Sequence, residues 1–280
     1  MLGYGVGTAW YKRDNVDKYD NACEKAVESA LKLGYRHLDA AESYKTEPEV
    51  GAAIKSSKLP RDKLFITTKV STSIDDIPSA LQASLSKLGL DYVDLFLIHS
   101  PFFAKDSPQP AALHQSKWAE MEKLKHRGLA KSIGVSNYLP EHLDYILETC
   151  SVCPAVNQIE FHPYLQHGNL LAYHRSKGIV TEAYSPLTPV TKASGGPVDD
   201  IVSALSKKYA VSPGEICLRW CIDQDVVPIT TSAKEERLSD FLRAMAFKLT
   251  PREIQDINEA GRKKHYRGYW TEYYDGGDKR

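Results

Sequence analysis

Short apolar runs recur along the chain, and each is followed by a longer stretch in which apolar residues return every three or four positions. Eight of the short runs are rich in β-branched or aromatic residues, a composition typical of strands. They span Gly3–Thr8, Tyr35–Asp39, Leu64–Lys69, Val93–His99, Lys131–Ser136, Ala155–Glu160, Ile179–Tyr184 and Val226–Thr230. The longer stretches predict helices over Asn21–Leu33, Glu47–Lys55, Ile77–Leu88, Leu113–His126, Pro140–Thr149, Gly168–Lys177, Asp199–Tyr209, Pro213–Gln224 and Lys234–Leu242.

The run from Val93 to Ile98 is almost continuously apolar, which is typical of a parallel strand covered on both faces. Strands that alternate with helices in this way close most simply into a (β/α)8 barrel, and a chain of 280 residues fits one such domain. We therefore expect a single-domain TIM barrel of the α/β class over residues 1–280. Helix ends carry matching signals, with Ser212 and Pro213 opening one helix. Left-handed glycines are expected after four others, at Gly34, Gly89, Gly128 and Gly178.

Composition narrows the classes of partner and compartment. The formal net charge is zero and no dense run of Lys or Arg occurs, so we expect neither a nucleic acid nor an anionic membrane as partner. The segment Met1–Trp10 is too short and glycine-rich for a signal peptide, and no stretch of about 18 apolar residues occurs. Five cysteines, an odd number, argue against a disulfide framework. These features predict a cytoplasmic protein, and nothing in them specifies an oligomeric state.

Ionisable residues end three neighbouring strands of the predicted barrel. Asp39 ends the second strand, Lys69 the third and His99 the fourth, while Tyr44 lies in the loop after Asp39. The C-terminal ends of barrel strands converge on the face that holds active sites. Each residue alone has an ordinary explanation, such as a helix cap or a solvated charge. Their joint occurrence at adjacent strand ends predicts a catalytic site.

The chemistry of this set favours protonation of a substrate oxygen. A tyrosine with a pKa near 10 is a poor acid at neutral pH. An ammonium group about 4 Å away favours the phenolate by roughly 4 kcal/mol at an effective dielectric constant of 20, or about three pKa units before desolvation opposes it. Lys69 is therefore expected to lower the pKa of Tyr44, with Asp39 holding Lys69 charged and His99 donating to a carbonyl oxygen. Such a set suits protonation of an alkoxide as hydride arrives.

The segments that hold these residues resemble the aldo-keto reductase superfamily, and the resemblance covers essentially the whole chain. It rests on Gly5-Val6-Gly7-Thr8, Gly34-Tyr35-Arg36-His37-Leu38-Asp39-Ala40-Ala41, Glu42-Ser43-Tyr44, Glu49-Val50-Gly51, Leu90-Asp91-Tyr92-Val93-Asp94-Leu95, Ile98-His99-Ser100-Pro101 and Ile133-Gly134-Val135-Ser136-Asn137. The resemblance implies reduction of small aldehydes or ketones with NADPH. It makes Tyr44 the general acid, tuned by Lys69 and Asp39, and gives His99 the role of positioning the carbonyl. No metal is implied.

The resemblance also implies how the cofactor, NADPH or NADP+, is held. Ser136, Asn137 and Gln158 would hold the nicotinamide carboxamide, Tyr184 would stack on the ring, and the loop from Ser185 to Leu187 would contact the pyrophosphate. The other cofactor candidates are Thr8 in the first motif and, after the last strand, Thr231, Ser232, Lys234 and Arg237.

The segment after the last strand departs from the commonest family pattern. Many relatives carry Pro-Lys-Ser here, and their lysine contacts the 2′-phosphate of the cofactor, but Thr231 occupies that place in this chain. Lys234 and Arg237 still supply two cations for a phosphate dianion, so NADPH remains the expected cofactor.

This variant segment looks most like that of the fungal conjugated polyketone and α-keto amide reductases. The segments Asn157–Pro163 and Ile98–Phe103 share that likeness. The subgroup suggests activated dicarbonyl substrates. Ser100 stands where aldose-reductase relatives often have Trp, so a sugar preference does not follow.

Three other patterns have structural explanations. The glycines of Gly3-Tyr4-Gly5-Val6-Gly7 lack the third glycine and the following helix of a dinucleotide-binding fingerprint. The pair Cys150 and Cys153 follows a helix instead of opening one, which favours chance spacing over a redox pair. Cys217 and Cys221 lie four apart on a predicted helix, which favours buried packing over zinc ligation.

Aromatic residues mark the expected substrate pocket. Trp10, at the exit of the first strand, is predicted to line it, and Phe102 is a second candidate, although Phe102 and Phe103 fit an ordinary core equally well. The tail from about residue 265 carries Tyr266, Tyr269, Trp270, Tyr273 and Tyr274. It could fold over the active-site mouth or lie beside the barrel.

Two other functions compete with the reductase. A regulatory barrel could bind NADPH with little turnover, as channel-associated members of this superfamily do. A barrel isomerase or lyase could use Lys69 to form a Schiff base.

Overall fold

A computed structural model describes residues 1–13, 18–274 and 277–280. Eight strands follow one another in chain order and form one closed parallel barrel, which confirms the predicted fold class. The strands are β1 Gly3–Gly5, β2 His37–Asp39, β3 Phe65–Val70, β4 Val93–Ile98, β5 Ala130–Ser136, β6 Val156–Glu160, β7 Val180–Tyr184 and β8 Val226–Thr230. Residue contacts divide the chain into two compact units. The N-terminal unit is Gly3–Asn157 with Thr231–Glu235, and the C-terminal unit is Met1–Leu2, Gln158–Thr230 and Glu236–Arg280.

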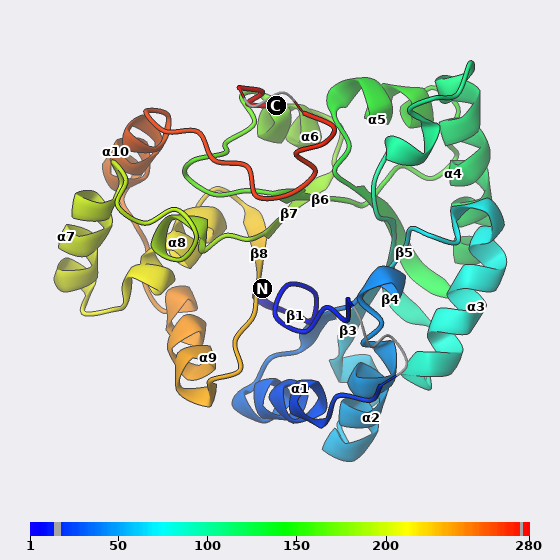
Figure 1. Cartoon of the computed structure of the whole chain (residues 1–280), viewed down its shortest axis with the longest axis horizontal. Coiled ribbons are helices and arrows are strands. Elements are labelled where there is room, and N and C mark those ends of the chain that lie inside the picture. The colour runs from blue at the N-terminus through cyan, green and yellow to red at the C-terminus, as the bar shows by residue number, and fades with distance from the viewer. Residues whose placement is uncertain (14–17, 275–276) are drawn as a thin grey trace. The chain divides into compact units, whose positions relative to one another are not determined.

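The N-terminal unit holds β1 to β5, and the register of these strands positions the site. Asp39 pairs with Thr67, two residues before Lys69, and Lys69 pairs with Leu97, two residues before His99. The ionisable residue of each strand therefore lies two residues further along the barrel than that of the preceding strand. Five helices lie outside the strands of this unit (Figure 1), namely α1 Asn21–Leu33, α2 Glu47–Ser57, α3 Ile77–Leu88, α4 Pro110–His126 and α5 Pro140–Leu147. Asp20 caps α1 by accepting from the backbone N–H groups of Ala22 and Cys23.

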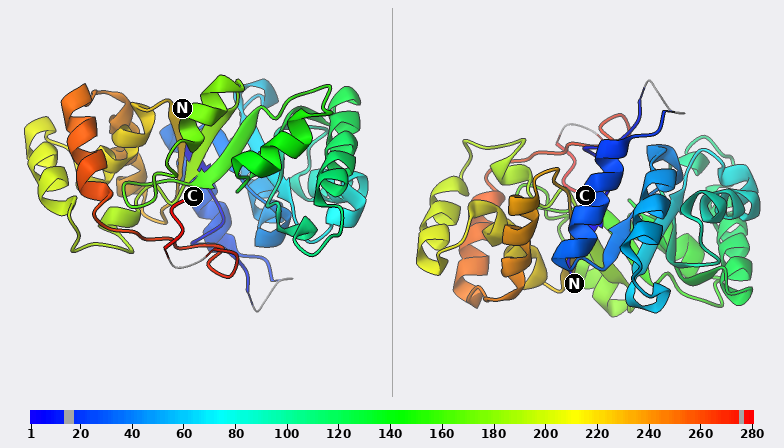
Figure 2. Two further views of the ribbon diagram at one scale, coloured as in Figure 1. Left: turned by 90° about the horizontal axis from the view of Figure 1, so that it is seen from above. Right: turned by 90° about the horizontal axis from the view of Figure 1, so that it is seen from below.

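The C-terminal unit carries the remaining helices. They are α6 Leu170–Ser176, α7 Asp199–Tyr209, α8 Pro213–Ile222, α9 Glu235–Leu242 and α10 Pro251–Gly261, the first residue of α9 belonging to the N-terminal unit. Figure 2 shows α7 and α10 side by side. The rings of Phe161 and Trp220 stack with centroids 4.8 Å apart in a buried cluster that includes Cys221 and Ile257.

Helix α10 has no counterpart among the nine helices expected from the sequence. Its only large apolar residues are Ile254 and Ile257, which lie on one narrow face, so few positions signal the helix although they recur with helical spacing. Its start nevertheless carries a readable signal, because Pro251 stands at the first position and Thr250 forms a capping box with Glu253. Ser212 and Glu215 form the same motif at the start of α8, where Pro213 had indicated it.

Other local predictions are confirmed. Gly34, Gly89, Gly128 and Gly178 have positive φ angles of 112°, 65°, 75° and 70°. Cys217 and Cys221 are buried and free. The Sγ atoms of Cys150 and Cys153 lie 3.7 Å apart, and burial together with Cys153 raises the pKa of Cys150 to about 11, the opposite of an activated thiolate; whether they form a redox pair stays a matter of prediction. Within the described residues, no helix is long and apolar enough to cross a membrane.

Buried histidines make the fold sensitive to acid. Desolvation lowers the pKa values of His37, His114, His167 and His174 to about 4. The unfolded chain therefore binds more protons below pH 6.5 than the folded one, and stability falls as the pH drops from about 6.5 toward 4. Each of these histidines should remove about 1.4 kcal/mol of unfolding free energy per pH unit in that window. Urea unfolding at pH 7 and pH 5 measures the effect, and equal unfolding free energies at both would contradict it.

Candidate active site

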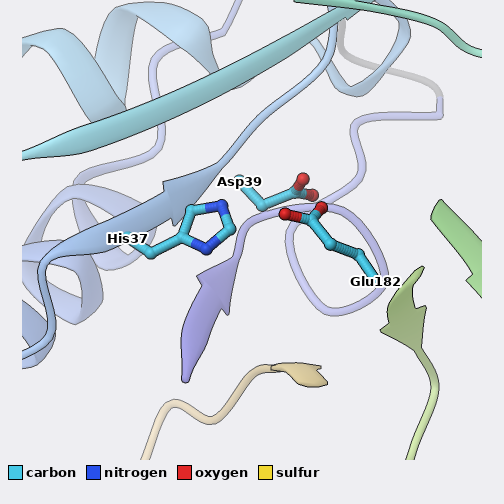
Figure 3. Close-up of side chains that lie close together, drawn as sticks. All are labelled: His37, Asp39 and Glu182. Carbon is cyan, nitrogen blue, oxygen red and sulfur yellow. The ribbon is translucent and has the colours of Figure 1, made fainter. Parts of the chain in front are cut away.

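Asp39 and Lys69 form a buried ion pair in the N-terminal unit. Lys69 at the end of β3 is fully buried and Asp39 at the end of β2 nearly so. The Nζ of Lys69 donates to Asp39 Oδ1 at 2.7 Å and to the carbonyl oxygen of Ala40 at 2.9 Å. Figure 3 shows Asp39 two residues beyond His37 on β2. The ion pair with Asp39 holds the ammonium group of Lys69 at a defined position.

Tyr44 lies beside that ammonium group. It ends the 3-10 helix Glu42–Tyr44, which the carboxylate of Glu42 anchors by accepting from the backbone N–H of Ser71 at 2.9 Å. The phenolic oxygen of Tyr44 lies 3.5 Å from Lys69 Nζ and 3.5 Å from His99 Nε2. The structure thus brings the four predicted catalytic residues together within one unit.

His99 presents a neutral imidazole to the same point. Desolvation and the charge of Lys69 lower its pKa to about 3. Its Nδ1 lies 3.3 Å from the hydroxyl of Ser43, which can donate to that nitrogen. The proton of the ring then sits on Nε2, which faces Tyr44 and can donate to a substrate oxygen.

Two residues that support this arrangement were not singled out from the sequence. The hydroxyl of Ser43 contacts His99 Nδ1, and its place next to Tyr44 in the Glu42-Ser43-Tyr44 motif was the available signal. Gly7 packs against the Tyr44 ring, since a Cβ at this position would lie 2.8 Å from Tyr44 Cζ. The absence of a side chain there leaves room for the phenol ring.

Ser43→Ala should reduce the rate of catalysis without weakening the fold. Loss of the hydroxyl removes the donor to His99 Nδ1 and lets the ring take the other tautomer, so we expect kcat to fall about tenfold, the worth of one hydrogen bond of about 1.4 kcal/mol. Ser43→Thr keeps the hydroxyl and should retain activity. Steady-state kinetics and thermal unfolding of both variants measure this, and equal losses in both would argue against a role for the hydroxyl.

The N-terminal unit also holds six of the predicted cofactor contacts. Asn137 has a left-handed backbone at φ 64°, and its amide donates to the carbonyl of His99 and to Ser136 Oγ, both at 3.0 Å. A carboxamide contact at Asn137 would therefore lie next to His99. Thr8 is exposed in a turn after β1. In the segment after β8, the hydroxyl of Ser232 accepts from the backbone N–H of Lys234 at 3.0 Å, the Lys234 side chain is exposed, and Thr231 is half-buried.

The C-terminal unit holds the other five predicted cofactor contacts. Gln158 donates its amide to Glu182 at 2.9 Å, which orients the side chain at β6. Tyr184 ends β7, followed by Ser185 with a φ of 54° and by half-buried Leu187. Arg237 is exposed in the first turn of α9. The chemistry of these residues suits amide, ring and phosphate groups.

The two predicted pocket residues lie in the N-terminal unit. Trp10 is half-buried, and its indole donates to the hydroxyl of Tyr4 at 3.2 Å. Phe102 is half-buried in the 3-10 helix Phe102–Ala104, whereas the Phe103 ring packs on buried His114 with centroids 4.8 Å apart. Phe103 therefore has a structural role, and Phe102 stays the pocket candidate.

The tail reaches the C-terminal ends of β6 and β7 within the C-terminal unit. The backbone N–H groups of Gly268 and Tyr269 donate to the buried carboxylate of Glu160 at 2.9 and 3.2 Å. The Tyr269 ring meets Tyr184 edge-on, with centroids 5.4 Å apart. The tail thus contacts the residue expected to stack on the cofactor.

Comparison with known proteins agrees with this geometry. The model of the aldo/keto reductase family matches residues 3–262. The chain is 41% identical over 270 residues to an NAD/NADP-dependent indole-3-acetaldehyde reductase of Schizosaccharomyces pombe, covering 95% of this chain and 93% of the relative. It is 41% identical over 282 residues to an NADPH-dependent alpha-keto amide reductase of Saccharomyces cerevisiae, covering 96% and 90%. The crystal structure of a Bombyx mori aldo-keto reductase in complex with NADP matches with a TM-score of 0.85 and 34% identity over 98% of this chain and 93% of that one. The chain therefore belongs to the aldo/keto reductase family of oxidoreductases.

Proposed function

We propose that this protein reduces aldehydes and ketones to alcohols with NADPH, and that Tyr44 protonates the substrate oxygen. The observation that carries the proposal is the position of the Tyr44 hydroxyl, 3.5 Å from both Lys69 Nζ and His99 Nε2. An acid, a cation that stabilises its conjugate base and a neutral donor meet at one point, which is what protonation of a developing alkoxide requires.

Each residue of the site has a separate role in the proposed reaction. Bound NADPH supplies the hydride to the carbonyl carbon. His99 Nε2–H donates to the carbonyl oxygen and orients it, and Tyr44 transfers its proton to that oxygen as negative charge develops. Lys69 stabilises the resulting phenolate, and Asp39 keeps Lys69 charged and fixed.

The cofactor proposal has support in this chain and in its relatives. The amide of Asn137, held between His99 and Ser136, suits the nicotinamide carboxamide, while the exposed cations Lys234 and Arg237 suit the 2′-phosphate. One relative is named for NADPH alone and another for both NAD and NADP. We propose NADPH as the preferred cofactor.

The substrate proposal is an activated dicarbonyl compound. The alpha-keto amide reductase and a methylglyoxal reductase of Yersinia pestis, 40% identical over 238 residues, are both named for adjacent carbonyl groups. An electron-withdrawing neighbour makes a carbonyl carbon more electrophilic, and its second oxygen offers another acceptor to donors in the pocket. Trp10 and Phe102 are the proposed pocket walls.

The contacts of Lys69 argue against Schiff-base chemistry. An ammonium group has three N–H donors, and Asp39, the Ala40 carbonyl and Tyr44 accept all three. The Nζ is also fully buried, so a substrate carbonyl cannot approach it. Lys69 acts as a charge in this site.

The test is oxidation of NADPH, with NADH in parallel, across simple aldehydes, diketones and keto amides. We expect turnover with NADPH and higher kcat/KM for the dicarbonyl compounds than for simple aldehydes of the same size. Tight NADPH binding without turnover on any substrate would contradict the reductase and favour the regulatory barrel. Equal kcat/KM for simple and activated carbonyls would contradict the dicarbonyl proposal and leave the reductase proposal standing.

A further inference from the structure

The C-terminal unit contains a cavity of about 380 Å³ that no part of the proposed reaction uses. Its walls come from the loop after β6, from α6, from the end of α10 and from the tail. Pockets that hold small organic ligands begin at roughly this size. The cavity could therefore contain a molecule larger than a single inorganic ion.

The charged side chains in the wall are all basic. Arg175, Arg262, Lys264 and Lys279 line the cavity together with two histidines, and no Asp or Glu does so among the described residues. The chain as a whole has a formal net charge of zero, so a general excess of basic residues does not explain this. Four cations around one cavity create a positive potential that attracts an anion.

Three of these cations have no carboxylate partner. In the described ranges 1–13, 18–274 and 277–280, no ion pair joins Arg175, Arg262 or Lys279 to an acid. Lys264 donates to the carbonyl oxygen of Ala193 at 2.8 Å, a neutral acceptor. The guanidinium groups remain available for bidentate contacts with a phosphate.

A buried histidine in the wall holds an unpartnered polar atom. The side chain of His167 is more than nine-tenths buried, and its Nε2 meets the carbonyl of Glu160 at 2.5 Å. That contact places the ring proton on Nε2, so Nδ1 is an acceptor, and it has no partner among the described residues. A buried acceptor without a partner costs free energy.

His265, the second histidine of the wall, also lies near positive charges. His265 lines the cavity, and its Nδ1 is also buried without a partner in the described part of the chain. Desolvation, Arg267 and Lys279 lower the pKa of His265. A dianion in the cavity would offset these positive charges.

We propose that this cavity is a binding site for a small phosphate monoester that carries hydroxyl groups, separate from the cofactor site. Arg175, Arg262 and Lys279 would contact the phosphate oxygens. Phe161 and Leu171 supply the apolar part of the wall.

The test is isothermal titration of the full chain with glucose 6-phosphate, in the presence of saturating NADP+ so that the 2′-phosphate site is filled. Inorganic phosphate and glucose, titrated in the same way, separate the phosphate contacts from the hydroxyl contacts. We expect saturable binding of glucose 6-phosphate, weaker binding of inorganic phosphate and none of glucose. Absence of saturable binding of glucose 6-phosphate would overturn the proposal, and equal affinity for inorganic phosphate would reduce the site to a phosphate site without selectivity for monoesters.

Two charge-matched variants locate the binding. Arg175→Gln/Arg262→Gln removes two cations from the wall, whereas Lys207→Gln/Lys263→Gln removes two exposed cations of the same unit that do not line the cavity. We expect the first to weaken binding about tenfold or more per lost charged contact and the second to leave it nearly unchanged. Equal weakening in both would show diffuse electrostatic attraction and overturn the site. Turnover in the absence of the ligand should be the same in both variants, so this result is independent of the proposed reductase.

Discussion

In Tyr44→Phe, kcat for carbonyl reduction should fall about 10²- to 10⁴-fold, the usual contribution of a positioned general acid. The substitution removes only the hydroxyl, so His99 still orients the carbonyl and the pocket keeps its shape. Stability should change by about 1 kcal/mol or less, because the lost contacts of this hydroxyl are both long, at 3.5 Å. NADPH affinity should remain near the wild-type value, since the phenol is assigned to the substrate oxygen.

Tyr11→Phe is the matched control for that result. The Tyr11 ring lies edge-on to Tyr44 with centroids 6.1 Å apart, but the residue is 45% exposed and makes no contact with Lys69 or His99 in the described part of the chain. We expect near wild-type kcat from this variant. Full activity in Tyr44→Phe, with an intact fold, would refute the assignment of the acid, and equal losses in both variants would indicate disturbed packing.

Lys69→Met should produce the largest loss of stability in the site. It leaves Asp39, which is 3% exposed, without its ion-pair partner. Removal of one member of a buried ion pair costs roughly 3–5 kcal/mol because the other charge stays buried. Carbonyl reduction should be lost as well, since Tyr44 no longer has a cation to stabilise its phenolate.

A double variant separates the two effects of Lys69. In Asp39→Asn/Lys69→Met no charge is left uncompensated, so the unfolding free energy should recover much of the loss while activity stays low. Urea unfolding and NADPH oxidation are measured for Asp39→Asn, for Lys69→Met and for the double variant. Additive destabilisation in the double variant would show that the two side chains do not depend on each other for stability.

The periodicity of apolar residues predicted the barrel, and the ionisable residues at its strand ends predicted a catalytic site. Strands such as β4 are short and apolar on both faces, and a polar residue at such a strand end has few places to lie except the C-terminal face of a barrel. The strands follow one another around the barrel in chain order, so consecutive strand ends could be predicted to be neighbours. This applies to Asp39, Lys69 and His99. Helix α10 was missed since its apolar face is narrow, although Thr250 and Glu253 signalled its start.

The sequence by itself determined the order of the eight strands and the three ionisable residues at their ends, with the candidate acid Tyr44 in the loop after one of them, because these depend on local period or on the end of a strand. Only the tertiary structure decided which residues support them. Ser43 reaches His99 across 56 positions of sequence separation, and Glu160 binds the tail across 108. The basic cavity gathers Arg175, Arg262 and Lys279 from segments far apart in the chain. Contacts of this kind depend on how distant segments pack, and no local pattern of residues encodes them.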